Sequence, residues 1–159
     1  MEPAGFDADT DAGCGGGRER SGVPPALVAA YRATRYEVTA ATPPFVLRVD
    51  EPSVELATCH RAHAVRCSTF VTAWNPGSQQ ATAAVNSAAG EALEQRLRAR
   101  GYRLLAGRGV DPAGRWPAEA SVLVLGLERD AACEIARHFG QAGLVCAGDD
   151  AVPRLVLLK

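Results

Sequence analysis

The sequence lacks most of the features that mark a specialised class of protein. Its formal net charge is only -1 and it contains no block of basic residues, so charge does not favour nucleic acid or a membrane surface as a partner. No apolar run approaches the roughly 20 residues that a membrane-spanning helix needs. The first residues do not combine a basic segment with an apolar one, so we expect no signal peptide and a cytoplasmic protein.

Recognised nucleotide-binding and hydrolase motifs are also missing. There is no Walker loop and no Gly-x-Ser-x-Gly motif. Gly107-Arg108-Gly109 follows a predicted strand, but no predicted helix follows it, so the context of a dinucleotide-binding motif is not met. The sequence therefore identifies no cofactor.

Cysteine does not occur in the patterns typical of disulfide frameworks or zinc sites. The five cysteines are odd in number and irregularly spaced, which fits a reducing compartment. On a helix, Cys59, His63 and Cys67 would share one face. A structural zinc ion needs four ligands, and no Cys-x-x-Cys pair or second His cluster completes the set. We therefore predict no metal site, and a partly buried helix over about residues 54–66.

The composition itself is that of one ordinary globular domain. Hydrophobic residues make up 47% of the 159 residues and charged residues 22%. Residues 1–23 contain a run of three glycines and almost no large apolar side chain, which predicts a disordered tail before a single α+β domain over 24–159. The preference for Ala, and for Arg over Lys, is typical of a GC-rich bacterial genome.

The residue pattern predicts alternating strands and helices between residues 68 and 147. Strands are expected at 68–74, 102–107, 120–127 and 143–147, and helices at 78–100 and 128–139. This β-α-β-β-α-β order is that of the ferredoxin-like split fold. Its first and third strands are apolar without alternation, as central strands would be.

Further elements are predicted outside this core. Extra strands are expected near 45–49 and 154–158, and a short helix over 26–36. An exposed outer strand could pair with a second copy and give a homodimer.

Several motifs occur in an order that resembles a known bacterial family. They are Thr72-Ala73-Trp74-Asn75-Pro76, Asn86, Asp111, the segment 116–121 and Phe139-Gly140-Gln141. Over about residues 31–159 the chain resembles the family catalogued as domain of unknown function 3293. The label of that family supplies no activity, so the resemblance implies a single bacterial domain and no particular chemistry.

The predicted topology brings polar side chains from distant parts of the sequence to one edge of the sheet. The helix after strand 68–74 begins at the edge where strand 102–107, parallel to it, ends. The ligand-binding candidates at this edge are Asn75, Ser78, Asn86, Asp111, Trp116, Glu119 and Gln141. Amide groups beside a Trp ring suit a small planar ligand with hydrogen-bonding groups, and two carboxylates suit a divalent metal or acid–base chemistry.

Most of these residues also have ordinary structural explanations. Asn75 before Pro76 resembles a helix N-cap or a turn residue, and Asn86 could brace the corner. Asp111 fits a turn, Trp116 a loop anchor, and Gln141 could bond helix-end carbonyls.

Two functions remain open from the sequence. The first is a module that binds a small polar ligand or a protein partner at the Thr72–Pro76 corner. The second is a hydrolase or transferase that uses Asp111 and Glu119, with or without a divalent metal. Binding of nucleic acid on the open sheet face is disfavoured, because the predicted strands do not interleave basic and aromatic residues.

Overall fold

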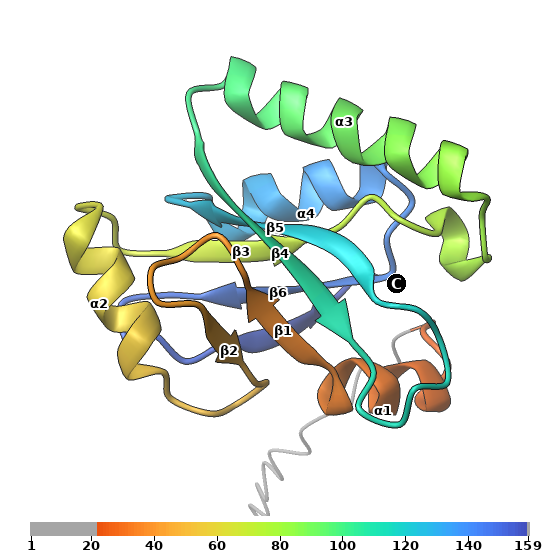
Figure 1. Cartoon of the computed structure of the whole chain (residues 1–159), viewed down its shortest axis with the longest axis horizontal. Helices are drawn as coiled ribbons and strands as arrows, with labels where there is room; N and C mark the ends of the chain where they lie inside the picture. The colour runs from red at the N-terminus through yellow and green to blue at the C-terminus, as the bar shows by residue number, and fades with distance from the viewer. Residues whose placement is uncertain (1–21, 159) are drawn as a thin grey trace, which may run out of the picture.

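The computed structural model describes residues 22–158, which form four α-helices and one antiparallel sheet (Figure 1). The strands are β1 (Arg35–Val38), β2 (Phe45–Leu47), β3 (Ser68–Val71), β4 (Arg103–Val110), β5 (Glu119–Leu125), β6 (Gly143–Ala147) and β7 (Arg154–Leu157). The helices are α1 (Pro25–Ala33), α2 (Val54–Ala62), α3 (Ala83–Ala99) and α4 (Arg129–His138), with a 3-10 turn, η1, at Pro76–Ser78. The strand order across the sheet is β2-β1-β4-β5-β3-β6-β7.

The sheet separates two apolar clusters. Leu93 of α3 and Ile135 of α4 pack with Val122 and Val124 on one face, whereas Leu56 of α2 belongs to the cluster on the other face. Every residue of β3 is buried, as are the last five residues of β5. The two strands that the sequence marks as apolar without alternation therefore lie inside the sheet and are covered on both faces.

The first part of the chain differs from the sequence-based expectation. A helix was expected to continue to residue 36, but α1 ends at Ala33 and β1 begins at Arg35. Thr34 takes an extended backbone conformation, which ends the helix, and its hydroxyl donates to the Ala30 carbonyl at 2.7 Å. Tyr36 and Val38 then face the core, a two-residue alternation too short to stand out beside the preceding helical pattern.

Other boundaries shift by a few residues. Helix α3 begins at Ala83 and not near residue 78, because the Thr82 hydroxyl accepts the Val85 N–H and acts as its N-cap. The strand predicted at 45–49 ends at Leu47. Almost all of the tail predicted as disordered lies outside the described residues, and Val23 at its end is buried. Among residues 22–158, no helix has both the length and the hydropathy needed to cross a bilayer.

Candidate functional site

A cavity of about 550 Å³ lies between α1, the sheet and the segments that flank η1. Its volume falls within the range of small-molecule binding sites. Helix α1 and the loop between β4 and β5, which are far apart in the sequence, both contribute to its wall and lie near each other in Figure 1. The five aromatic residues of the wall are Tyr31, Tyr36, Phe70, Trp74 and Trp116.

Six of the seven residues predicted to gather at one edge line this cavity. They are Asn75, Ser78, Asn86, Trp116, Glu119 and Gln141. Ser78 is exposed and Trp116 is 40% exposed, whereas Asn86 is only 4% exposed. Asp111, the seventh, is not part of the wall.

The side chains of Asn86, Asn75 and Glu119 form one hydrogen-bonded chain. Asn86 Oδ1 accepts the backbone N–H of Asn75 at 2.8 Å, and Asn86 Nδ2 donates to Asn75 Oδ1 at 3.0 Å. Asn75 Oδ1 also accepts the backbone N–H of Ala81 at 3.0 Å. Because a backbone N–H can only donate, both amide orientations are fixed, and Asn75 Nδ2 must point to Glu119 Oε1, 2.7 Å away.

The backbone at Asn75 turns sharply and is held from a second side by the segment after α4. Asn75 has φ 51° and ψ 58°, a left-handed conformation that Asn tolerates better than most residues. The Gly77 N–H donates to the Gly140 carbonyl at 2.8 Å, and Gln141 Nε2 donates to the Trp74 carbonyl at 3.0 Å. The N-cap interpretation of Asn75 is therefore wrong for its side chain, which braces the corner and does not cap η1.

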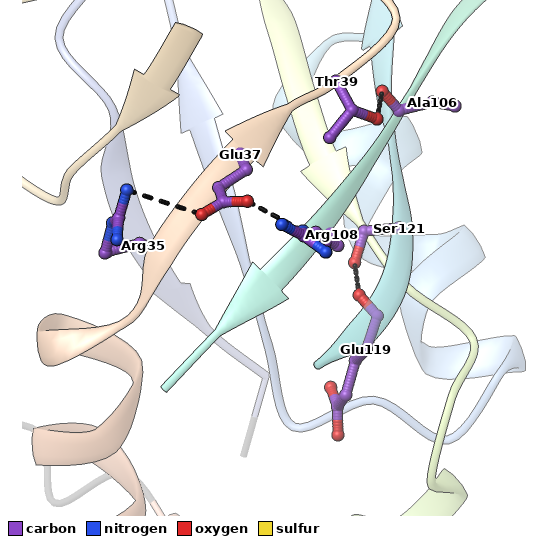
Figure 2. A network of polar contacts seen from close by, with 7 residues as sticks. All are labelled: Arg35, Glu37, Thr39, Ala106, Arg108, Glu119 and Ser121. Carbon is purple, nitrogen blue, oxygen red and sulfur yellow. Dashed lines mark hydrogen bonds and ion pairs between the residues drawn. The ribbon is translucent and has the colours of Figure 1, made fainter. Parts of the chain in front are cut away.

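Glu119 presents a partly buried carboxyl group to the cavity. Burial raises the pKa of Glu119, and the hydrogen bond from Asn75 opposes that rise. Its second oxygen, Oε2, receives no hydrogen bond from the described residues. Figure 2 shows the Glu119 carboxylate pointing away from Arg108, whose guanidinium faces Glu37 at 2.7 Å.

Asp111 has a different role, because its oxygens already have partners in its own loop. Oδ1 accepts the Ala113 N–H at 3.0 Å, and Oδ2 accepts the Arg115 N–H at 2.9 Å. Burial alone would raise the pKa of Asp111, but these hydrogen bonds and the Arg115 guanidinium lower it. The structure therefore assigns Asp111 to the turn and does not bring it together with Glu119 in the cavity.

The aromatic wall contributed by α1 and β1 was missed by sequence reasoning. Tyr31 follows the helical stripe of α1, but nothing in that stripe indicates where the helix docks. The Tyr36 hydroxyl donates to the Tyr31 carbonyl at 2.6 Å, and the Tyr36 ring meets Phe70 edge to face with centroids 5.3 Å apart. Burial raises the pKa of Tyr31, and the charge of Glu119 adds to that rise while a hydrogen bond with Ser78 opposes it.

The segment of Cys59, His63 and Cys67 lies away from this cavity. His63 Nδ1 is 3.0 Å from the guanidinium of Arg103. The neighbouring His60 is buried and its Nε2 lies 2.8 Å from the Ser68 hydroxyl. Within the part of the chain that the structure describes, no three His, Cys, Asp or Glu side chains are grouped so that they could hold a metal ion.

Comparison with known proteins gives one match. No curated protein and no solved structure matches the chain. Residues 71–144 match the family model described as protein of unknown function (DUF3293). This segment is shorter than the resemblance over 31–159, but it runs from the end of β3 into β6 and includes the Asn75 corner and Glu119. Over residues 71–144 the chain is therefore similar to the DUF3293 family.

Proposed function

We propose that this protein is a small-molecule binding module and that its ligand occupies the cavity beside Asn75 and Glu119. The observation that carries this proposal is a cavity of about 550 Å³ whose wall combines aromatic rings with a hydrogen-bonded polar corner. Sites for small molecules are typically apolar with a few positioned polar groups.

The wall favours a flat and largely apolar ligand. Tyr36 and Phe70 already pack against each other, so their rings would lose little conformational freedom on binding. The Asn75 and Asn86 amides are likewise fixed by their own hydrogen bonds. A site ordered before binding spends less of its interaction energy on ordering side chains.

The two-carboxylate enzyme considered from the sequence has less support. That function needs Asp111 and Glu119 to act on one substrate or metal ion. The Asp111 oxygens accept hydrogen bonds from Ala113 and Arg115, and Asp111 is not part of the cavity wall. Glu119 alone retains an oxygen that is open to a ligand.

We also propose that β3-α3-β4-β5-α4-β6 is a ferredoxin-like unit, extended by β1 and β2 at one edge and by β7 at the other. Its support is the adjacency β4-β5-β3-β6 with all neighbours antiparallel. A fold of this kind does not by itself imply a function. Bacterial origin, a cytoplasmic location and a homodimer stay predictions from the sequence.

Binding in the cavity can be tested with two small neutral aromatic probes, p-cresol and indole, by saturation-transfer NMR. We expect transfer to both probes with the unmodified chain. Ala30→Phe should abolish it, because Ala30 is buried and lines the cavity. Ala29→Phe, at an exposed position of the same helix, is the matched control and should retain it. Equal transfer with both variants, or none with the unmodified chain, would contradict the proposal.

A further inference from the structure

We propose that the natural ligand carries a protonated primary or secondary amine on a flat apolar body, and that Glu119 binds the amine. This inference rests on the proposed binding of a small molecule in the cavity, and it adds the charge and chemical class of that molecule. Three observations carry it: the charge of the wall, the fixed geometry of the carboxylate, and the pairing of the nearby arginines.

The cavity wall is negative. Among the described residues that line it, Glu119 is the one side chain that can carry a formal charge near neutral pH, and Lys, Arg and His do not contribute. A ligand carboxylate or phosphate would meet a negative charge without a cation to balance it. An ammonium group would find the opposite charge in partly buried surroundings, where charge pairing is stronger than in bulk water.

The carboxylate is positioned to accept a second donor. Its Oε1 is bonded to Asn75 Nδ2 at 2.7 Å, and the Asn75 amide is itself fixed by Asn86 and Ala81. Within the described residues Oε2 has no hydrogen-bond partner. An ammonium N–H would form a short, charge-assisted hydrogen bond with this oxygen.

Three arginines of β1, β4 and the β4–β5 loop are already paired with other carboxylates. Arg108 Nε lies 2.7 Å from Glu37, and the Arg35 guanidinium lies 3.5 Å from the same side chain (Figure 2). Arg115 lies 3.5 Å from Asp111. Burial without a cation also raises the pKa of Glu119, and a bound ammonium would favour its ionised form.

The aromatic rings of the wall suit the same ligand. Trp74 and Tyr31 line the cavity, and so does Trp116, whose ring already has the Arg115 guanidinium over it, 5.4 Å from the centroid. Such rings attract a cation over their faces and also pack against a planar body. An aryl-alkyl amine therefore satisfies the carboxylate and the rings together.

The test compares tryptamine, the neutral tryptophol and the anionic indole-3-propionate, which share one ring system, by isothermal titration calorimetry at pH 7. We expect tryptamine to bind roughly tenfold or more tightly than the other two, the factor typical of a charge-assisted hydrogen bond. Glu119→Gln should remove the preference and leave tryptophol binding unchanged. Glu91→Gln, which removes a charge from an exposed position of α3, should keep the preference.

The outcomes separate the two proposals. If p-cresol and indole bind but tryptamine is not preferred, or if Glu119→Gln retains the preference, the amine inference is wrong while binding in the cavity stands. If neither these probes nor the three indole compounds bind, both proposals fail. Circular dichroism of Glu119→Gln confirms its fold, and Glu119→Asp, which keeps the charge, should retain part of the tryptamine preference.

Discussion

Replacing Asn86 with alanine should destabilise the protein far more than its position on a helix suggests. The side chain is 4% exposed and makes two hydrogen bonds of 3.0 Å or less with Asn75. The substitution removes both and leaves the Asn75 N–H without an acceptor in partly buried surroundings. Two hydrogen bonds contribute about 1 kcal/mol each and an unsatisfied donor costs about 1–3 kcal/mol, so we expect a loss of roughly 3–5 kcal/mol.

Urea unfolding at pH 7, followed by circular dichroism, measures this loss as a lower midpoint of the transition. Ser87→Ala is the matched control, because Ser87 is the next residue of α3 and is exposed. We expect this control to change the free energy of unfolding by less than about 0.5 kcal/mol. If Asn86→Ala costs no more than Ser87→Ala, the view that Asn86 holds the corner is refuted.

The same variant tests whether the corner positions the Glu119 carboxylate that is proposed to bind the ligand. Without Asn86, the Asn75 amide keeps only the Ala81 N–H to fix its orientation, so Glu119 loses part of its support. Tryptamine should then bind more weakly to Asn86→Ala even at temperatures where the variant is folded. In a double-mutant cycle the losses from Asn86→Ala and Glu119→Gln should not add, because they act through one network. Additive losses would show that the two residues act independently.

Three further predictions concern stability. Burial lowers the pKa of His60 below 6.5, so the unfolded chain binds the extra proton more readily than the folded chain. The free energy of unfolding should therefore fall as pH decreases below about 6.5. In urea unfolding at several pH values, His60→Gln should reduce this dependence. Thr82→Ala removes the N-cap of α3 and should cost about 1 kcal/mol in the same assay. Gly140→Ala should lower the midpoint temperature of thermal unfolding, because Gly140 has φ 69° and a Cβ atom there would lie 3.2 Å from Pro76 Cβ. A midpoint unchanged from that of the unmodified chain would contradict the close approach of these segments.

The sequence predicted the parts of the fold that depend on local pattern. The apolar segment that contains β3 and the helical stripe of α3 are long enough to be recognised without knowledge of their partners. The short alternation in β1 was not recognised, because four residues after a helix carry too little pattern. Its strand character depends on pairing with β2 and β4, which are distant in the sequence.

The candidate site was predicted in part for a similar reason. The expectation that Asn75 and Glu119 meet at one sheet edge followed from the direction of the predicted strands, and these residues are in fact hydrogen-bonded. The separate roles of Asp111 and Glu119 could not be predicted from the directions of the strands. Asp111 and Glu119 are both acids near the ends of strands, but the oxygens of Asp111 are occupied by its own loop, whereas one oxygen of Glu119 stays open within the described residues.

By itself the sequence determined a mixed α+β fold, the apolar central strands and the polar corner at Asn75, because these depend on side-chain pattern and on the backbone preferences of Asn, Pro and Gly. Only the tertiary structure decided that α1 closes a cavity over that corner, and that Glu119 faces it without a paired cation among the described residues. The physical reason is that docking and charge pairing depend on distances between residues far apart in the chain. Local pattern carries no information about those distances.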